Sequence, residues 1–250
     1  MSTRRDFLKT MSLASAGMML GGGQWINAMT PGSTPEQKRA SADKVKIAFI
    51  GIGNRGAQII GDFERTQQID VVALCDVDLD GRQCQEVLAK FPKAKRFRDF
   101  RKMFDEMGNK FEAVVVETPD FSHFPCVMLA LNQGKHVYVE KPMGRTFYEC
   151  ELMIQAAKRN PHLVTQGGNQ GHSEANYFQF KAWMDAGIIK DVTAVTAHMN
   201  NARRWHGWDS NIQKFPAGEQ LPPDMDWDTW LCAAAHHDYH HDYHRHRDPR

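Results

Sequence analysis

The stretch VKIAFIGIGNRG, residues 45–56, joins an apolar run to three glycines at the spacing G-x-G-x-x-G. The apolar run predicts a buried strand over residues 45–52, and the pattern after it predicts a helix that continues to about Arg65. Gly51 permits a tight turn between the two, and Gly56 permits close packing of the helix on the strand. The stretch therefore predicts the first strand–turn–helix unit of an α/β domain.

Short apolar strands alternate with helical patterns for the next part of the chain. Further strands are expected at residues 71–76, 95–97, 113–117, 136–140 and 163–167, and further helices at residues 80–90, up to 107, 121–132, 146–159 and 173–186. Uninterrupted apolar strands between helices indicate a parallel sheet covered on both faces. Because crossovers between parallel strands are right-handed, the predicted fold class is α/β with a doubly wound parallel Rossmann sheet.

A carboxylate follows the glycines at the spacing of a dinucleotide site. Asp76 ends the second predicted strand, about 20 residues after Gly56, where a carboxylate accepts hydrogen bonds from the adenosine ribose. Gly53 lets a pyrophosphate approach the backbone, and the helix N-terminus faces the phosphates. Repulsion of a 2′-phosphate by Asp76 favours NAD over NADP, a preference that Arg55 and Arg82 would soften. The alternative is a doubly wound domain that binds no dinucleotide.

Two more strand ends carry polar residues at the carboxyl edge of the sheet. Residues 117–123 read ETPDFSH, and residues 139–142 read VEKP. Taken singly, the lysine is more often a solvated side chain and the histidine a helix cap. Together with GIGNRG, in this order, the motifs resemble the Gfo/Idh/MocA family of sugar and cyclitol oxidoreductases, from about Lys44 to Leu231. The pairing of TP-x-x-x-H with EKP is quite specific to that family.

The resemblance implies a role for each matched residue. Lys141 would be the catalytic residue, held beside the nicotinamide by a turn at Pro142, with a cis bond as one form of that turn, and hydrogen-bonded to the substrate hydroxyl. Glu140 would reach the nicotinamide-side ribose, and Thr118, Pro119 and His123 would line the path from pyrophosphate to nicotinamide. Asn169 and Gln170, in the loop QGGNQ, would supply amide contacts. The complete set of expected cofactor-binding residues is Gly51, Ile52, Gly53, Asn54, Arg55, Gly56, Asp76, Thr118, Pro119, His123, Glu140, Lys141, Asn169 and Gln170.

The expected activity is NAD(P)-dependent oxidoreduction, with hydride passing between the nicotinamide and a hydroxyl of a sugar, cyclitol or glycoside. Two alternatives stay open. One is a redox-neutral, NAD-dependent glycoside hydrolase or lyase, and the intact EKP lysine favours simple oxidoreduction over it. The other is an inactive fragment that binds dinucleotide without turning over a substrate.

The C-terminal part of the chain follows the family pattern only in part. Residues 225–231, MDWDTWL, resemble a WDxWL element of the family, but the sequence leaves the family pattern at Arg245. The family's acid–base histidine lies in a later segment, for which His172 is a stand-in candidate. We therefore expect a dinucleotide-binding domain at residues 44–168 and the start of an α+β substrate domain at 169–250, truncated or frame-shifted. A homo-oligomer is expected for a full-length chain.

Three further segments allow competing interpretations. Residues 192–199, VTAVTAHM, alternate like a strand with one wet face. Residues 200–208, NNARRWHGW, suit either sugar stacking or domain packing. His236, His240 and His244 would share one face of a helix and attract zinc or nickel, but tyrosines and aspartates interrupt them. We expect no physiological metal site there.

The N-terminus resembles an export signal. Residues 3–9 read TRRDFLK, similar to the twin-arginine pattern, and a weakly apolar run follows that is too short for a stable membrane span. We expect a signal at residues 1–28, cleaved near Ala28, and a polar linker at 29–43. An ordinary signal or a disordered tail is the alternative. The twin-arginine export machinery carries folded cargo, so a periplasmic protein with tightly bound NAD is expected.

The overall composition excludes other classes of partner. The 31 basic and 30 acidic side chains nearly cancel, with no basic stripe of the kind that binds nucleic acid. The five cysteines are odd in number and contain no CxxC pair, which favours buried reduced thiols over a disulfide framework. The partner that the family resemblance implies is a small carbohydrate substrate.

Overall fold

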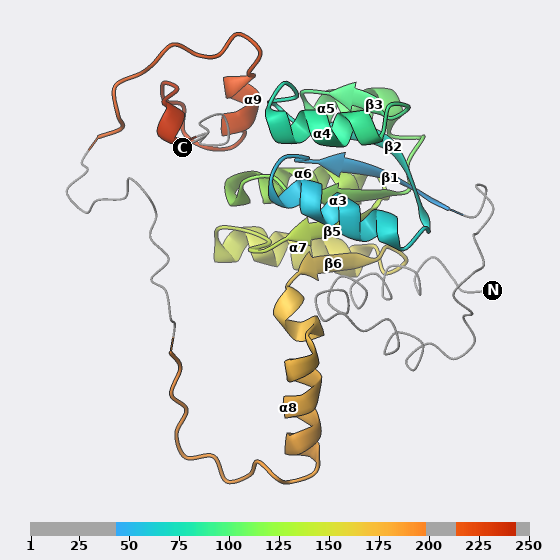
Figure 1. Cartoon of the computed structure of the whole chain (residues 1–250), viewed down its shortest axis with the longest axis vertical. Coiled ribbons are helices and arrows are strands. Elements are labelled where there is room, and N and C mark those ends of the chain that lie inside the picture. Colours follow the sequence, from blue (N-terminus) through green and yellow to red (C-terminus); the bar gives the residue numbers. More distant parts are fainter. Residues whose placement is uncertain (1–43, 199–213, 244–250) are drawn as a thin grey trace.

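The computed structural model describes residues 44–198 and 214–243. Its centre is a six-stranded sheet of order β3-β2-β1-β4-β5-β6, in which every neighbouring pair is parallel (Figure 1). The predicted α/β class with a doubly wound sheet is confirmed. The strands are β1 (Val45–Ile50), β2 (Ile69–Cys75), β3 (Lys95–Phe97), β4 (Ala113–Val116), β5 (His136–Glu140) and β6 (Thr165–Gly168).

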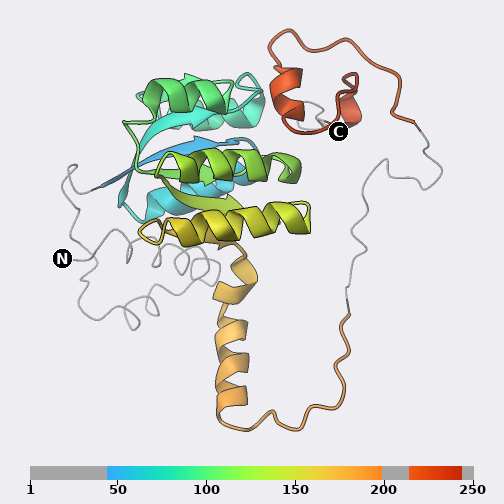
Figure 2. The ribbon, with the colours of Figure 1, turned by 180° about the vertical axis from the view of Figure 1, so that it is seen from behind.

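Helices cover both faces of the sheet. One face carries α3 and α4, and the opposite face, seen in Figure 2, carries α5, α6 and α7. Their bounds are α3 (Arg55–Arg65), α4 (Arg82–Lys90), α5 (Phe100–Met107), α6 (His123–Asn132) and α7 (Phe147–Arg159), with a short 3-10 turn, η3 (Asp120–Ser122), before α6. Each helix lies within a few residues of its predicted position.

The alternation of side chains along each strand divides the core in two. Ile47 and Phe49 of β1 pack among the residues of α3 and α4. Ala48 and Ile50, which alternate with them along the strand, face α5, α6 and α7. Both sets are almost completely buried. Because burial of one such large side chain stabilises a fold by about 1.5–3 kcal/mol, the sheet needs both helical layers.

Helix starts are set by polar caps. Thr146 begins α7 with a capping box, in which its hydroxyl accepts from the Glu149 N–H and the Glu149 carboxylate accepts from the Thr146 N–H. The Asp99 carboxylate begins α5 by accepting from the Arg101 N–H. The capping box explains why α7 begins close to the predicted start at residue 146.

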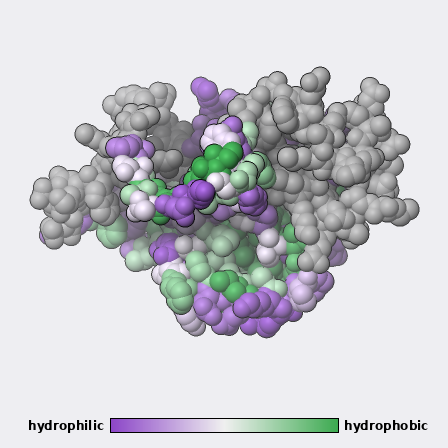
Figure 3. All heavy atoms as spheres, turned by 90° about the horizontal axis from the view of Figure 1, so that it is seen from below, coloured by the Kyte–Doolittle hydropathy of each residue, from purple (hydrophilic) through white to green (hydrophobic). Residues whose placement is uncertain are grey.

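Beyond the sheet, the chain continues through η4 (Gln170–Ser173) into α8 (Ala175–Asp185). Figure 1 shows α8 extending away from the sheet, and none of its residues is buried. Figure 3 looks onto this end of the molecule, where hydrophobic side chains reach the surface. The exposed apolar residues of α8 are Tyr177, Phe178, Phe180, Trp183 and Met184.

The expected strand at residues 192–199 is wrong for the residues that the structure describes. Residues 192–198 form neither strand nor helix, and Met199 lies outside the described residues. A strand needs a hydrogen-bonding neighbour, and the six strands of the described sheet pair only with one another. Period-two alternation alone does not supply that neighbour.

Residues 214–243 return to the sheet and pack beside β2 and β3. This segment contains α9 (Trp227–Leu231) and η5 (His241–Tyr243), with an apolar cluster around Trp227. The Arg98 guanidinium donates to the carbonyl oxygens of Val77 and Asp224 and so ties the segment to the end of β2. The rings of Phe121 and Trp230 meet edge to face with centroids 5.1 Å apart.

Several predicted features fall outside the described residues. They are the signal and linker at residues 1–43, the aromatic and basic cluster at 200–208, and His244. Within the part of the chain that is described, no helix is long and apolar enough to cross a membrane. All five cysteines are free, and Cys75, Cys84 and Cys126 are buried, as expected.

Two glycines of α3 give a matched test of the turn geometry. A Cβ at Gly56 would lie 2.1 Å from the Gly51 carbonyl oxygen, whereas a Cβ at Gly61 would meet nothing within 4 Å. Gly56→Ala is expected to destabilise the fold by about 2–3 kcal/mol through this overlap. Gly61→Ala is expected to stabilise it by up to about 1 kcal/mol. Chemical denaturation followed by circular dichroism measures both, and equal effects would contradict the assigned turn.

Candidate functional site

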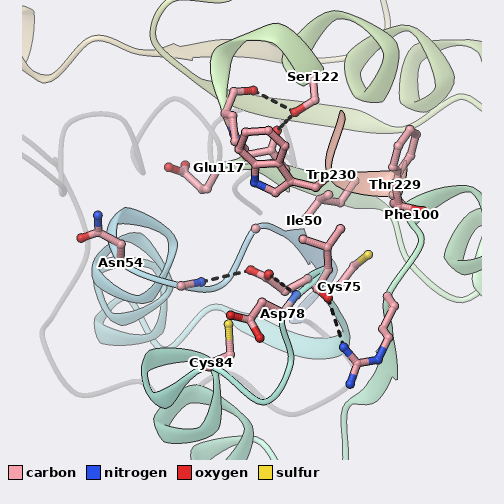
Figure 4. A pocket seen from close by; sticks show the side chains of 18 of the residues that line it. Ile50, Asn54, Cys75, Asp78, Cys84, Phe100, Glu117, Ser122, Thr229 and Trp230 are labelled. Carbon is pink, nitrogen blue, oxygen red and sulfur yellow. Dashed lines mark hydrogen bonds between the residues drawn. The ribbon is translucent and has the colours of Figure 1, made fainter. Parts of the chain in front are cut away.

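A pocket of about 300 Å³ opens at the carboxyl edge of the sheet (Figure 4). The turn between β1 and α3 forms its floor, and the ends of β2 and β4 form its flanks. Of the residues predicted to bind a cofactor, those that line it are Gly51, Gly53, Asn54, Arg55, Asp76, Thr118 and Pro119. Residues distant in the sequence therefore meet where parallel sheets of this kind bind ligands.

Gly51 and Gly56 shape the turn for the reasons predicted. Gly51 has φ +83°, and a Cβ there would lie 2.6 Å from the carbonyl oxygen of Glu117. Only glycine fits this combination of left-handed backbone and close contact. Gly53 is less confined, since its Cβ would meet the Cys84 Sγ at 3.5 Å, the Gln83 Oε1 at 3.9 Å and the Asp76 Oδ2 at 4.0 Å, all ordinary contact distances. The turn therefore brings the half-buried backbone of Gly53 to the pocket, next to the first turn of α3.

Asp76 directly contacts the turn between β1 and α3, residues 51–56, which we call the glycine turn. Its Oδ2 atom accepts from the backbone N–H groups of Ile52 at 2.8 Å and Gly53 at 3.3 Å, and its Oδ1 accepts from Asp78 N–H at 3.0 Å. The spacing that predicted a ribose contact also places this carboxylate as a brace for the turn. A second brace is the Gln83 side-chain oxygen, which accepts from the Asn54 N–H. Sequence reasoning missed both bracing contacts.

Arg55 and Glu140 form an ion pair between α3 and β5. The Nε atom of Arg55 lies 3.1 Å from Oε1 of Glu140, whose exposed fraction is only 6%. The other oxygen of Glu140 accepts from the backbone N–H of Lys141 at 2.6 Å. Both oxygens of Glu140 are thus engaged, and the turn at Lys141 is held against the end of β5.

His123 braces the same turn from the other side. Its side chain is 1% exposed, with Nδ1 2.6 Å from the Pro142 carbonyl oxygen and Nε2 2.7 Å from the Thr118 carbonyl oxygen. Each ring nitrogen thus lies against a backbone carbonyl oxygen, one on each of two loops. His123 therefore lies behind the wall of the pocket and joins the two loops that follow β4 and β5.

Lys141, Asn169 and Gln170 lie at the neighbouring strand ends. The Lys141–Pro142 bond is cis, as the resemblance implied, and the Lys141 side chain is exposed. Among the described residues its ammonium group has no ion pair or hydrogen bond. Asn169 and Gln170 follow β6 and are exposed, as is His172. None of the four lines the pocket over the glycine turn, so they mark a separate, more open part of the sheet edge.

Glu117 lines the pocket, and the sequence motifs assigned it no role. It follows β4 directly, is 9% exposed, and neither carboxyl oxygen has a hydrogen-bond partner among the described residues. Burial raises the pKa of Glu117 to about 8, the nearby charge of Glu140 adds to the increase, and Arg55 opposes it. An acidic residue directly after the strand AVVV is the sequence signal that points to this position.

A second missed feature is the wall contributed by the C-terminal segment. Thr229 and Trp230 line the pocket opposite Asp78 and Cys84 (Figure 4), and Cys232 and Tyr243 also line it. The stretch WDTWL matched a family pattern in the sequence, but its place over the pocket depends on contacts with Arg98 and Phe121. The pocket therefore combines the Rossmann sheet with residues more than 100 positions later in the chain.

The histidine-rich tail does not form the helix considered above. Residues 232–240 contain no helix, so His236 and His240 do not share a helical face. Instead, Nδ1 of His241 lies 2.8 Å and Nε2 of His240 lies 3.4 Å from Oε1 of Glu219. Glu219 and His241 are exposed. The Glu219 carboxylate accepts from the His241 backbone N–H as well, so these contacts act as loop hydrogen bonds.

Residues 45–167 match the family GFO_IDH_MocA, described as an oxidoreductase family with an NAD-binding Rossmann fold. The match covers just under half of the chain. The glycine turn, the braced Asp76 and the motifs TPDFSH and EKP all lie within the matched residues. The family expected from the sequence motifs is therefore confirmed.

Individual relatives agree with this placement. The chain is 29% identical over 160 residues to inositol 2-dehydrogenase of Salmonella typhimurium, covering 63% of this chain and 46% of the relative. It is 26% identical over 239 residues to a glycosyl hydrolase family 109 protein of Shewanella pealeana, covering 81% of this chain and 50% of the relative. The chain thus spans about half the length of these curated relatives.

A solved structure shares the fold. The scyllo-inositol dehydrogenase from Lactobacillus casei, solved with bound NAD(H) and scyllo-inositol, superimposes with a TM-score of 0.55 at 26% identity. The match covers 60% of this chain and 43% of that protein. The coverage again spans less than half of the relative.

Replacement of Glu117 tests the assigned burial. Between the ordinary carboxyl pKa of 4.5 and about pH 8, the folded state holds a proton that the unfolded chain has lost. The free energy of unfolding should therefore fall as pH rises through this window, by up to about 1.4 kcal/mol per pH unit, and level off above it. Glu117→Gln removes this titration. The melting temperature of the variant minus that of the wild type should therefore increase from pH 5 to pH 9.

The matched control is Glu151→Gln, at an exposed position of α7. Its melting temperature should follow that of the wild type across the same pH range. Parallel curves for wild type and Glu117→Gln would show that the Glu117 carboxyl is solvated in the folded protein.

Proposed function

We propose that the protein is an NAD-dependent oxidoreductase that acts on a hydroxyl of a cyclitol, sugar or glycoside. The observation that carries this proposal is the glycine turn, which Asp76 braces and which lines the pocket. In the family, the backbone of this turn would bind the pyrophosphate of the cofactor. NAD would supply the hydride acceptor at this site. The residues of the chain would bind it, orient the substrate and hold the proton of the reacting hydroxyl.

The glycine turn fits the diphosphate of a dinucleotide. Gly53 and Asn54 lead into the N-terminus of α3, where the helix dipole favours an anion. Asp76 would accept the adenosine ribose hydroxyls with the lone pairs that the turn leaves available. A 2′-phosphate would meet the same negative charge, which supports NAD over NADP. Titration of the protein with NADH and NADPH measures this preference.

Lys141 is proposed as the residue that contacts the substrate hydroxyl. Its backbone is fixed by Glu140 and by the His123 contact at Pro142, while its ammonium group has no partner among the described residues. A fixed backbone with an uncommitted cation suits a group that hydrogen-bonds a hydroxyl and stabilises the negative charge that develops on its oxygen. Asn169 and Gln170, at the next strand end, are proposed as further contacts with the nicotinamide part of the cofactor.

Lys141→Met separates catalysis from cofactor binding. Loss of the cation should reduce turnover of the substrate at least about 100-fold, because positioned proton donors and acceptors contribute 10²–10⁴ to rate. Affinity for NADH should stay within about threefold of wild type. NADH absorbance with a panel of inositols, sugars and glycosides measures turnover, and NADH fluorescence measures binding. Lys158→Met, at an exposed site on α7, is the control.

Retained turnover in Lys141→Met would reject the proposed role of the lysine. Absence of NADH binding in the wild type would reject the proposed function as a whole. Binding without turnover of any substrate in the panel would favour a chain that holds dinucleotide but lacks a complete substrate site.

A redox-neutral reaction on glycosides is the second candidate, because several relatives are named glycosyl hydrolase family 109 proteins. In that route hydride is removed from the sugar and later returned to it. Release of the aglycone without net formation of NADH would support this candidate over simple oxidoreduction.

We also propose that residues 1–28 direct export by the twin-arginine route and that NAD is bound before export. The support is the sequence TRRDFLK together with the cofactor site that follows it. A reporter fused to residues 1–43 should reach the periplasm, and replacement of Arg4 and Arg5 by lysine should abolish its export at unchanged charge. The matched control is Lys38→Arg, and export of the double variant by the same route would contradict the proposal.

A further inference from the structure

Glu117 lies under the glycine turn at the point where β4 ends. Its carbonyl oxygen would be 2.6 Å from a Cβ at Gly51, and its own Cβ would be 3.4 Å from a Cβ at Gly56. The residue therefore touches both the start of the turn and the N-terminus of α3. It also lines the pocket together with Gly53 and Asn54.

The carboxyl group at this position lacks any compensating contact. Both of its oxygens are buried and have no hydrogen-bond partner among the described residues. No dashed line joins Glu117 to another residue drawn in Figure 4. Most buried carboxyl groups are hydrogen-bonded or paired with a cation. An unpartnered carboxyl group that faces a pocket is therefore not explained by the stability of the fold and points to a role in ligand binding.

The charged or titratable groups that act on Glu117 come from two neighbouring elements. Arg55 belongs to α3, and Glu140 and Tyr138 belong to β5. Arg55 already forms an ion pair with Glu140 at 3.1 Å, so its charge is shared before Glu117 ionises. Burial also raises the pKa of Tyr138 above its ordinary value, which keeps that phenol neutral. If Glu117 were ionised, the region beneath the glycine turn would contain two carboxylates, Glu117 and Glu140, and only one guanidinium, that of Arg55.

We propose that Glu117 is a proton-binding residue that controls how tightly the pocket holds a dinucleotide. The inference rests on the proposed function, since it concerns the same pocket. With Glu117 protonated, the corner beneath the glycine turn carries one carboxylate and one guanidinium and accommodates the diphosphate of the cofactor. With Glu117 ionised, an added negative charge in a poorly solvated position repels that diphosphate.

Linkage makes the effect reciprocal. If the dinucleotide binds the protonated form more tightly, then a bound dinucleotide must in turn strengthen the hold of Glu117 on its proton. Binding near the pKa of Glu117, about 8, would therefore take up a fraction of a proton from solution. A carboxyl group with a purely structural role would change the stability of the fold with pH but would leave both affinity and proton uptake unchanged.

The first test measures NADH affinity by fluorescence titration of the full chain from pH 7 to pH 9.5. The dissociation constant of the wild type should rise about tenfold or more over this range, with a limiting slope of one decade per pH unit. Glu117→Gln should bind NADH with a dissociation constant that varies less than about twofold. Glu151→Gln, on the exposed side of α7, should follow the wild type.

The second test uses only the wild type and so does not depend on the folding of a variant. NADH is added at pH 8 in weak buffer with an indicator dye, and uptake of a fraction of one proton per bound NADH is expected. No proton uptake, or an unchanged pH dependence in Glu117→Gln, would overturn the inference while NADH binding upheld the proposed function. A wild type that binds no NADH at any pH would overturn both.

Discussion

The contact between Asp76 and the glycine turn is the constraint on which the site depends. One carboxylate oxygen accepts two backbone N–H groups, from Ile52 and Gly53, and so joins the end of β2 to the turn that leaves β1. Backbone donors at such a turn would otherwise need water or a ligand. Because a charged acceptor strengthens these bonds, the turn keeps its shape and presents the N-terminus of α3 to the pocket.

The other side of the turn is set by the close approach of β4. β1 lies between β2 and β4, so the end of β4 is brought directly beneath Gly51. That arrangement leaves no space for a side chain at Gly51 and places Glu117 against the start of α3. This arrangement also places two carboxyl groups, Glu117 and Glu140, near a single guanidinium, that of Arg55, so their negative charges are not balanced when both are ionised. A proton on Glu117 is the simplest resolution.

The turn at Lys141 and the pocket over the glycine turn are built by different means. The turn at Lys141 is fixed by the Glu140 carboxylate, which accepts from the Lys141 N–H, and by the contact of the His123 ring with the Pro142 carbonyl oxygen. Both side chains are almost fully buried. The far wall of the pocket is fixed by Arg98, which holds residues 214–243 against the end of β2. The sheet edge at the end of β6, beside α8, is more open, and the apolar residues of α8 are exposed there.

Local patterns in the sequence determined the strands, the helices, the glycine turn and the position of Asp76. They did so because period, glycine spacing and helix caps act between residues a few positions apart. Tertiary structure alone decided the rest. The pair of Arg55 and Glu140 joins residues 85 positions apart, and the isolation of Glu117 follows from the order of the strands. The strand expected at residues 192–199 and the helix considered for the histidines failed for the same reason, since periodicity describes a face but does not provide the partner that must cover it.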